Sequence, residues 1–443
     1  MDTLDELRAG RLHGARELRL SSGLTNFPDE IFDFADSLEV LDLSGNQLDS
    51  LPDDLPRLHR LRVLFCSGNP FRVLPEVLGR CPQLEMVGFK SCRIESVPAE
   101  ALPPRLRWLI LTDNRIRQLP ASIGRRGRLQ KLMLAGNLLE TLPVELARCA
   151  RLELLRVAAN RLVELPDWLL KMPRLSWLAY AGNPFCAGLE AARKACIQVP
   201  GLPWSELMLQ QVLGEGASGV IHQARWDADG AARDVAVKCF KGAVTSDGLP
   251  GNEMVVCLDS GRHVGLIPVL GRLQGHPEGI EGLVMERVDP GFSTLAGPPS
   301  RASCTRDVYT PGLTLSAAAS LRLAADMAAV AAHLHARGIL HGDLYAHNIL
   351  HRPDGKALLG DFGAASFIPL DDRALADGLQ RLEVRAFGCL LEELIEHSDD
   401  SDPAGAVMPA LVALRDRCLH LDPGARPLFA ELVGALSTLR GGQ

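Results

Sequence analysis

The strongest constraint on the fold of this chain is a repeat of 23 residues in its first half. Asparagine recurs at this interval, except that Cys92 replaces one asparagine and the next interval is one residue shorter. The asparagines are Asn46, Asn69, Asn114, Asn137, Asn160 and Asn183. Such a period predicts stacked copies of one small structural unit rather than a single core.

Each copy contains the pattern LxxLxLxxN, as in the stretch from Leu38 to Asn46. The leucines would point inward from a short strand, and the asparagine side chains would form a ladder of hydrogen bonds with the backbone. A proline follows Cys92 and each asparagine except Asn183 by six residues, where the strand has ended and no backbone donor is needed. Residues 15–185 therefore resemble leucine-rich repeats. We expect an α/β leucine-rich repeat solenoid with helical caps at Met1–Gly14 and Cys186–Ala195.

The residues between the inward leucines form two columns on the concave strand face. Many are large and apolar, which predicts a surface that binds a protein partner or substrate. The alternative is that the ends of the array or the second half of the chain cover them. The predicted surface residues are Val40, Val63, Phe65, Met86, Trp108, Ile110, Met133 and Trp177.

Composition argues against other partner classes. The chain has 47 Lys and Arg against 54 Asp and Glu, so a nucleic-acid partner is not expected. The apolar run Ala317–Leu334 is interrupted by Arg322 and Asp326, which predicts a buried helix and no membrane span. The 11 cysteines include no CxxC pair and the acidic N-terminus has no apolar stretch, so we expect reduced thiols and a cytoplasmic location.

From Trp204 the repeat gives way to strand patterns and then to helical ones, so we divide the chain into domains at 1–200 and 201–443. The predicted strands are Leu207–Leu209, Val220–His222, Val235–Cys239 and short strands near Ile349–Leu359. The predicted helices begin with an alanine-rich one after Leu315 and continue at Leu382–Glu396, Met408–His420 and Leu428–Leu439.

Four motifs in this half point to phosphoryl transfer. They are the glycine-rich Gly214–Val220, Val235–Lys238 (VAVK), His341–Asn348 (HGDLYAHN) and Asp361–Gly363 (DFG). A glycine-rich loop alone is weak evidence, but the four in this order are specific. Residues 211–439 thus resemble a protein kinase domain, and the whole chain is similar to bacterial leucine-rich repeat protein kinases. The resemblance implies an α+β bilobal kinase-like domain that uses ATP and Mg²⁺ to phosphorylate a protein, with serine/threonine the expected type.

The resemblance also implies the catalytic roles. Lys238 would contact the inner phosphates and be oriented by Glu253, although the residues alone leave open a solvated acid at 253. Asp343 would accept or orient the proton of the attacking hydroxyl, while Asn348 and Asp361 would hold Mg²⁺.

Further residues are expected to bind the nucleotide. Glycines in the first motif would let the backbone approach phosphate oxygens, and a short hinge would hydrogen-bond adenine. This set is Gly214, Gly216, Gly219, Val220, Ala236, Lys238, Met285, Glu286 and Val288.

The chain departs from the kinase pattern in His341–Asn348, which corresponds to the catalytic loop of kinases, and after it. Gly342 stands where many regulated kinases have arginine, so a phosphorylated loop would find no guanidinium there. Tyr345 and His347 occupy the positions that separate serine/threonine from tyrosine enzymes, and they leave this choice open. Only 21 residues separate Asp361 from Leu382 and no APE triplet lies between them, so the peptide-docking segment is short or missing.

Three further features of the second half lie outside the four motifs. Glu383 resembles the aspartate of the DxWxxG helix. Arg426 lacks its usual glutamate partner and is either paired elsewhere or solvated. The insert Asp289–Gly312 shows no recognisable chemistry and is interpreted as a surface loop.

Two alternatives to a protein kinase stay open. The HGD triplet is also typical of small-molecule phosphotransferases related to aminoglycoside and choline kinases. A catalytically silent scaffold is the other alternative, although Lys238, Asp343 and Asp361 are all present. We expect the repeats either to recruit a protein to the active site or to cover the site and inhibit it.

Overall fold

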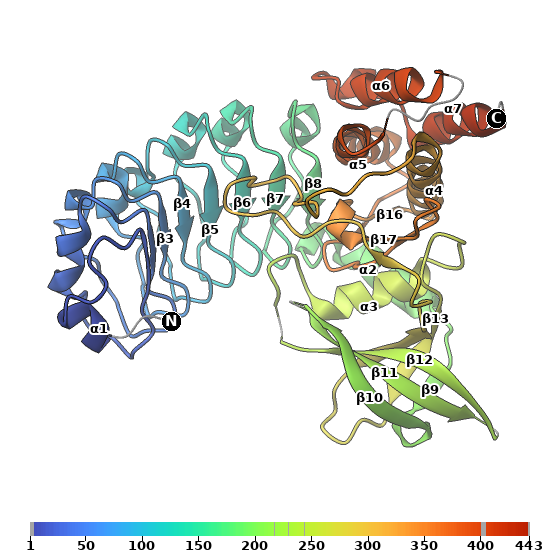
Figure 1. The fold of residues 1–443 in the computed structure, drawn as a ribbon, viewed down its shortest axis with the longest axis horizontal. Coiled ribbons are helices and arrows are strands. Elements are labelled where there is room, and N and C mark those ends of the chain that lie inside the picture. The colour runs from blue at the N-terminus through green and yellow to red at the C-terminus, as the bar shows by residue number, and fades with distance from the viewer. Residues whose placement is uncertain (1–3, 217, 229, 243, 400–404, 442–443) are drawn as a thin grey trace. The chain divides into compact units, whose positions relative to one another are not determined.

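A computed structural model of the chain describes residues 4–216, 218–228, 230–242, 244–399 and 405–441. It contains two compact units (Figure 1). The first comprises Met1–Arg174 and Asn183–Phe185, and the second comprises Leu175–Gly182 and Cys186–Gln443. Residues 175–182 therefore pack with the second unit, although their sequence continues the repeat.

The first unit is built on parallel strands in sequence order, each three residues long (Figure 1). Equivalent repeat positions are direct neighbours across the sheet, as in the pairs Val40 with Val63 and Val63 with Met86. The strands are β1 (Glu17–Arg19), β2 (Val40–Asp42), β3 (Val63–Phe65), β4 (Met86–Gly88), β5 (Trp108–Ile110), β6 (Lys131–Met133) and β7 (Leu154–Arg156). The short helix α1 (Leu4–Arg8) precedes them. The parallel-strand repeat region is thus as the sequence predicts.

The asparagines form the predicted ladder. The side-chain amide of Asn69 donates to the carbonyls of Leu43 and Cys66 at 2.9 Å each and accepts from the N–H of Leu48 at 2.9 Å. Cys92 replaces only part of this pattern, since its thiol donates to the carbonyl of Cys66 at 3.4 Å. The ladder satisfies backbone groups that would otherwise be buried without partners.

The repeat prolines lie after the strands, as predicted, and all but the first directly precede a 3-10 helix. Pro75, for example, has extended backbone with φ −60° and caps η3. A proline fits here because the first turn of a helix needs no N–H donor from it. The 3-10 helices are η1 (Asp29–Phe34), η2 (Leu55–Arg57), η3 (Glu76–Arg80), η4 (Ala99–Ala101), η5 (Ala121–Arg125), η6 (Val144–Arg148) and η7 (Asp167–Lys171).

Only half of the predicted binding-surface residues are accessible. Val40, Phe65, Trp108 and Ile110 are partly exposed. The buried residues are Val63, Met86, Met133 and Trp177, each with less than a tenth of its surface accessible. One reason lies on the strand face itself, where neighbouring side chains cover each other: the indole N–H of Trp108 lies 3.4 Å from the sulfur of Met133. The sequence period places residues on a face but does not show how large side chains lie across neighbouring strands.

The second unit begins with β8 (Trp177–Ala179) and α2 (Ala187–Cys196). The 3-10 turn η8 (Pro184–Cys186) lies between them in the chain, and its first two residues belong to the first unit. A six-stranded sheet follows, in the order β10-β11-β12-β14-β13-β9. Its strands are β9 (Gly201–Pro203), β10 (Leu207–Glu215), β11 (Gly219–Ala228), β12 (Ala231–Phe240), β13 (Val269–Gln274) and β14 (Gly282–Glu286). The short helix η9 (Trp204–Glu206) joins β9 to β10, and α3 (Pro250–Asp259) lies between β12 and β13 in the chain.

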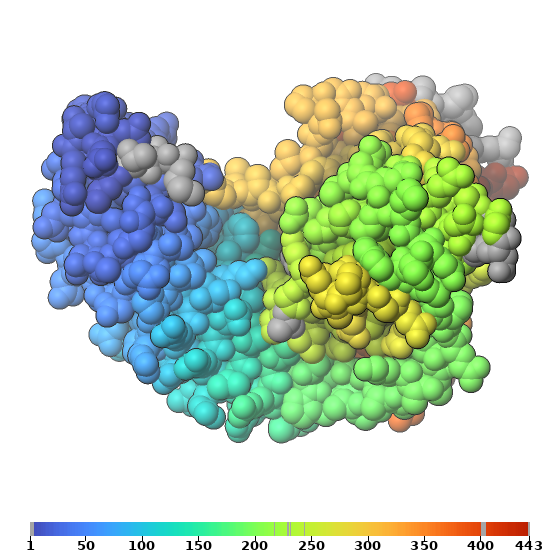
Figure 2. Space-filling view, turned by 90° about the horizontal axis from the view of Figure 1, so that it is seen from below, coloured from blue at the N-terminus to red at the C-terminus, as the bar shows by residue number. Residues whose placement is uncertain are grey.

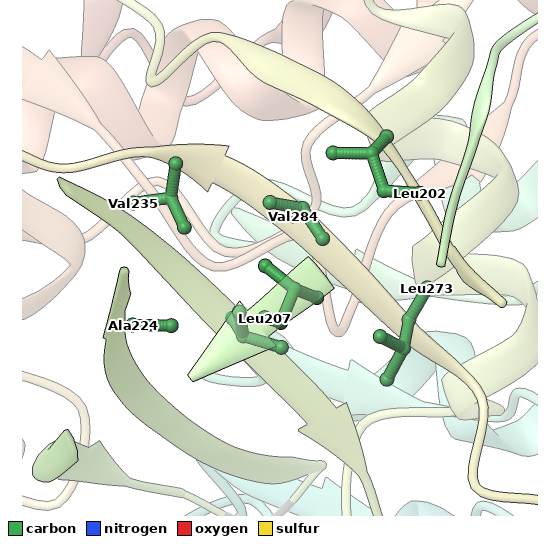
Figure 3. Packing of buried hydrophobic residues seen from close by; sticks show 7 residues of the cluster. Leu202, Leu207, Ala224, Val235, Leu273 and Val284 are labelled. Atoms are coloured by element: carbon green, nitrogen blue, oxygen red, sulfur yellow. The ribbon is translucent and has the colours of Figure 1, made fainter. Parts of the chain in front are cut away.

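One face of this sheet carries a compact apolar core (Figure 3). The buried residues come from all six strands and include Leu202, Leu207, Val235, Leu273 and Val284. Leu202 belongs to β9, which pairs in parallel with β13 at the edge. Residues just before the predicted strand-rich lobe thus complete its core. The outer surface of this lobe is green to yellow in Figure 2.

The rest of the second unit is mainly helical. Its helices are α4 (Ala317–Ala336), α5 (Arg373–Glu396), α6 (Val407–Cys418) and α7 (Phe429–Gly441), with the 3-10 helices η10 (Ala346–Asn348) and η11 (Pro423–Ala425). The short strands are β15 (Ser293–Thr294), β16 (Ile339–Leu340), β17 (Ile349–His351), β18 (Ala357–Leu359) and β19 (Ser366–Phe367). By length and composition α4 alone, among the described residues, is apolar enough to cross a membrane, and 61% of that stretch is buried in the structure.

The prediction for α5 was wrong at its start. The helix begins at Arg373 rather than at Leu382, because the carboxylate of Asp372 caps it by accepting the N–H of Leu375 at 3.0 Å. The segment between Asp361 and this helix is therefore even shorter than the sequence indicated.

Candidate active site

Lys238 and Glu253 form a buried ion pair in the second unit. Lys238 lies on β12, which pairs with β11 on one side and β14 on the other, so its backbone is fixed. Glu253 lies in the first turn of α3, and 2% of its side chain is exposed. The alternative of a solvated acid at 253 is therefore wrong.

The ammonium group of Lys238 keeps its positive charge although it is buried. Burial lowers the pKa of Lys238, but the nearby carboxylates of Glu253 and Asp361 outweigh burial and leave that pKa above its ordinary value. Lys238, Glu253 and Asp361 line one cavity. The structure thus brings together three predicted site residues from separate elements.

Apolar residues form the rest of this cavity, among them Ile221 and Met285. Ile221 pairs with Lys238 in the β11–β12 register, whereas the predicted Val220 pairs with Cys239. Adjacent strand residues point to opposite faces, so Ile221 takes the place assigned to Val220. The register with the lysine is the signal that could have corrected this error.

The other predicted nucleotide contacts lie on β12 and on or after β14. Ala236 is buried on β12 two residues from Lys238, and it pairs with Met285. Glu286 and Val288 line a neighbouring cavity instead. The N–H of Glu286 donates to the carbonyl of Pro268 at 2.9 Å, so this N–H already has a hydrogen-bond partner within the domain.

The three predicted loop glycines have different surroundings. A Cβ on Gly219 would collide with the carbonyl of Cys239, so packing of β11 on β12 requires this glycine. A Cβ on Gly214 or Gly216 would meet nothing within 4 Å. Packing therefore does not explain these two glycines, and an open backbone of this kind is what phosphate oxygens need. Ala217, within the same motif, lies outside the described residues.

Asn348 fixes the geometry of Asp343. Its side-chain amide donates to the carbonyl and to the carboxylate of Asp343, at 2.9 Å each. The carbonyl of Asn348 accepts the N–H of Gly360 at 2.9 Å, which ties this loop to the residue before Asp361. His341 adds a second tie by a 2.9 Å hydrogen bond between its imidazole Nε2 and the Gly360 carbonyl.

Asp361 has an exposed carboxylate and an unusual backbone. Its φ is +51°, a left-handed conformation that a non-glycine residue adopts only when its surroundings enforce it. Its carboxylate accepts the N–H of Gly363 at 3.0 Å. The turn thereby directs this carboxylate toward the cavity that it lines with Lys238.

Comparison with known proteins agrees with this geometry. Residues 207–389 match the family model described as protein tyrosine and serine/threonine kinase, and residues 15–71 and 104–162 match a leucine-rich repeat model. The chain has leucine-rich repeats fused to a protein kinase-type domain.

Individual relatives match parts of the chain. It is 31% identical over 170 residues to the angiopoietin-1 receptor of Danio rerio, which covers 37% of this chain and 15% of the receptor. It is 33% identical over 92 residues to PH domain leucine-rich repeat-containing protein phosphatase 1 of Homo sapiens, which covers 20% of this chain and 5% of the phosphatase. The mouse protein of the same name matches at 30% identity over 92 residues. The chain thus spans a small fraction of the length of these relatives.

Glu383 of the kinase-type domain binds the backbone of the catalytic loop. Its buried carboxylate accepts the N–H groups of Gly342 at 2.6 Å and His341 at 3.3 Å, and it lies 2.6 Å from the His335 imidazole. Burial raises the pKa of Glu383, but these hydrogen bonds and the neighbouring histidines outweigh burial and lower that pKa overall. Glu383 thus acts as the carboxylate anchor that its resemblance to the DxWxxG helix suggests.

Gly342 is required by packing. Its φ is +73°, and a Cβ there would lie 2.6 Å from the carbonyl oxygens of both Ala364 and Leu178. No arginine fits at this position of the kinase-type domain. Steric crowding therefore explains the departure from the arginine of regulated kinases.

The insert of residues 289–312 is more than a surface loop. Asp307 in this insert has a buried carboxylate that accepts the N–H of His347 at 2.9 Å and lies 2.8 Å from its Nδ1. Burial lowers the pKa of His347, but Asp307, together with Asp343 and Asp361, outweighs burial and raises it. Sequence analysis missed Asp307 because no motif marks it.

Arg426 is paired rather than solvated. It is buried, and its guanidinium donates to the carbonyls of His420 at 2.8 Å and Arg381 at 3.1 Å. Burial lowers the pKa of Arg426 to about 10. These main-chain contacts replace the missing glutamate.

Proposed function

We propose that this chain is an ATP-dependent protein kinase that transfers the γ-phosphoryl group of ATP to a serine or threonine hydroxyl of a protein. The observation that supports it most is the single cavity lined by Lys238, Glu253 and Asp361. Asp343 is linked to this lining through Asn348, whose amide binds its carboxylate and whose carbonyl accepts the N–H of Gly360. Phosphoryl transfer depends mainly on positioning and on neutralising charge, and these residues can do both.

Each residue has a defined task in this proposal. Lys238, kept charged and oriented by Glu253, binds the inner phosphates of the nucleotide. Asp343 orients the attacking hydroxyl and accepts its proton, while Asn348 keeps the carboxylate in place. The open backbone at Gly214 and Gly216 lies against the phosphates.

The residues also fit a magnesium ion. The carboxylate of Asp361 and the amide oxygen of Asn348 are hard oxygen donors of the kind that Mg²⁺ prefers. Within the described part of the chain, no group of three or more His, Cys, Asp or Glu side chains could hold a metal by itself. Two protein ligands with substrate phosphates completing the shell is the usual arrangement for Mg²⁺, which would neutralise phosphate charge there.

The acceptor is the open part of the proposal. Tyr345 is buried, and His347 is held by Asp307, so neither is placed to select the acceptor hydroxyl. The short segment before Arg373 offers little room to dock an extended peptide, which keeps a small-molecule acceptor as the second candidate.

Three acceptor classes distinguish these candidates. Purified full-length protein is incubated with Mg²⁺ and labelled ATP plus casein, a Glu–Tyr copolymer, or a mixture of choline and aminoglycosides. The proposal predicts label on serine or threonine of casein or of the enzyme itself, lost in Asp343→Asn. Label only on the small molecules would replace it with the second candidate.

We further propose that the repeats bind a protein partner or substrate through the partly exposed residues Val40, Phe65, Trp108 and Ile110. Leucine-rich repeats generally mediate protein interactions, and capture on a tethered surface raises the local concentration of a substrate. Binding that delivers a substrate and binding that covers the active site predict opposite effects of blocking this face.

Substitution on the strand face tests this role better than truncation, because residues 175–182 and 186–200 pack with the kinase-type domain and a cut at residue 201 would damage it. Phe65→Arg and Ile110→Arg place charge on the face, and Val144→Arg is the matched control on an exposed 3-10 helix. Recruitment predicts slower phosphorylation of a captured protein with unchanged autophosphorylation, and inhibition predicts faster autophosphorylation. Identical behaviour of all three variants would contradict any role of this face.

A further inference from the structure

The catalytic loop is packed against β8. The indole of Trp177 stacks on the ring of Tyr345 with 4.1 Å between centroids and an angle of 8°. Its N–H donates to the carbonyl of Leu344 at 3.1 Å, and 1% of Trp177 is exposed. Leu344 and Tyr345 directly follow Asp343. Trp177 therefore fixes the backbone that carries the proposed catalytic carboxylate.

The segment after Asp361 is held by the next residues of the same stretch. The hydroxyl of Tyr180 donates to the carbonyl of Phe367 at 2.9 Å, and the N–H of Tyr180 donates to the hydroxyl of Ser366 at 3.2 Å. Burial raises the pKa of Tyr180 well above its ordinary value, so its hydroxyl keeps the proton that it donates. Ser366 and Phe367 form β19, which pairs with β16.

Helix α2 contacts the helix that carries Glu253 (Figure 1). The carboxylate of Glu190 accepts from the side chain of Asn252 at 3.3 Å, next to Glu253. At the other end of α3, Arg193 forms an ion pair with Asp259 at 3.2 Å. Two contacts spaced along α3 resist both its rotation and its displacement.

Arg193 also links α2 to the segment after Asp361. Its guanidinium lies 5.6 Å from the centroid of the Phe367 ring. The side chain of Arg193 thus contacts both α3, which carries Glu253, and β19, which follows Asp361 in the chain.

Phosphorylation has no accessible target in this segment. Ser366 is the only Ser, Thr or Tyr between Asp361 and Arg373. Its side chain is fully buried and its oxygen accepts the N–H of Tyr180. With no arginine able to fit at Gly342, the loop also lacks a cation there to bind a phosphate.

We propose that residues 175–182 and 186–196, termed the β8–α2 brace, hold α3, the catalytic loop and β19 in the active arrangement, so that the kinase-type domain is active without phosphorylation of the segment after Asp361. Trp177, Tyr180 and Arg193 are its positioning residues. This inference rests on the proposed phosphotransfer function and adds how that activity is regulated.

Conservative variants of the full-length chain test the brace. Trp177→Phe and Tyr180→Phe remove one polar group each while keeping a ring, and Arg193→Gln removes the ion pair to Asp259. Lys194→Gln is the matched control, since Lys194 is an exposed neighbour on α2. Steady-state kinetics of phosphorylation, Mg-ATP affinity and thermal unfolding are measured for each variant.

The brace predicts a separation of kinetic effects. Trp177→Phe and Tyr180→Phe should lower kcat on the order of tenfold with little change in Mg-ATP affinity, because they displace the catalytic loop and β19. Arg193→Gln should also weaken Mg-ATP binding, because α3 orients Glu253 and thereby Lys238, and Arg193→Lys should restore part of the loss. Wild type treated with a phosphatase should retain its kcat.

Other outcomes overturn the brace. They are unchanged kcat in all three folded variants, equal losses in Lys194→Gln, activity losses that only follow the unfolded fraction, or loss of wild-type activity after phosphatase treatment. An inactive wild type that also fails to bind Mg-ATP would instead contradict the proposed function, so the two failures are distinguishable.

Discussion

The side-chain amide of Asn348 donates two hydrogen bonds to Asp343, one to its carbonyl and one to its carboxylate, both at 2.9 Å. Both bonds use the same nitrogen, which leaves the amide oxygen directed elsewhere. One residue can therefore position the proposed catalytic carboxylate and offer an oxygen ligand to Mg²⁺.

Asn348→Ala should lower kcat on the order of a hundredfold, because it removes the bonds that orient Asp343 and one metal ligand. The apparent Mg²⁺ requirement should rise in the same variant. Kinetics at several Mg²⁺ concentrations measure both effects, with Asn26→Ala on the exposed surface as the control. A normal kcat at saturating Mg²⁺ would contradict the positioning role.

Gly342→Ala should destabilise the kinase-type domain and abolish activity. The added Cβ would press on the carbonyls of Ala364 and Leu178, and φ of +73° is strained for alanine, so we expect a loss of about 2–4 kcal/mol. Gly360→Ala is the matched control for stability, since its Cβ would have only ordinary contacts no closer than 3.7 Å. Denaturant unfolding of both variants gives the comparison. Equal stability of the two variants would contradict the packing role of Gly342.

Glu383→Gln should destabilise the domain most near neutral pH. Because the folded-state pKa of Glu383 is lowered, its stabilisation is present above the unfolded pKa and is lost as the pH falls through the folded pKa. The glutamine also brings an amide donor against backbone N–H groups, so we expect a loss of about 2–3 kcal/mol at pH 7. The difference in unfolding free energy between wild type and variant should shrink as the pH falls below about 4. A difference independent of pH would contradict an ionised Glu383.

Glu393→Gln should have the opposite pH dependence. Burial raises the pKa of Glu393 to about 8, and the hydroxyl of Tyr309 donates to its carboxyl group at 3.0 Å. Since the folded pKa is raised, the wild type loses stability as the pH rises from the unfolded pKa through about 8. Glutamine keeps an acceptor for Tyr309 and does not titrate. The unfolding free energies of wild type and variant, measured from pH 5 to 9, should therefore converge at low pH, and the variant should be the more stable at high pH. Curves that stay parallel over this range would refute the burial argument.

The asparagine ladder gives a prediction that is independent of catalysis. Asn69→Ala should cost about 2–4 kcal/mol, because it leaves the carbonyls of Leu43 and Cys66 and the N–H of Leu48 buried with fewer partners. Cys92→Asn should instead stabilise the repeats by about 1 kcal/mol by completing the ladder. Thermal unfolding of the two variants should shift in opposite directions, and shifts of the same sign would count against the ladder.

Sequence could predict those features that depend on period or motif. The 23-residue interval gave the parallel strands, and the four motifs placed Lys238 and Asp361 in one cavity. Glu253 followed from its place on the helix after the lysine, although only the structure showed it buried and paired.

The rest depended on long-range packing, which a single sequence does not record. Asp307 reaches His347 across 40 residues and belongs to no motif. Trp177 fits the repeat period as a surface residue, yet it is buried against Tyr345, 168 positions later in the chain. The choice between Val220 and Ile221 did not depend on long-range packing. Strand alternation relative to Lys238 could have shown that Ile221, rather than Val220, faces the cavity.

Transfer of label from γ-labelled ATP with Mg²⁺ by the purified full-length chain tests the central claim most directly. Wild type is compared with Lys238→Met and Asp361→Asn, and with Lys194→Gln as a control. The account predicts protein-bound label in wild type and in Lys194→Gln, and a fall on the order of a hundredfold or more in the two active-site variants. No label in wild type across the acceptor panel, or undiminished label in Lys238→Met and Asp361→Asn, would contradict it.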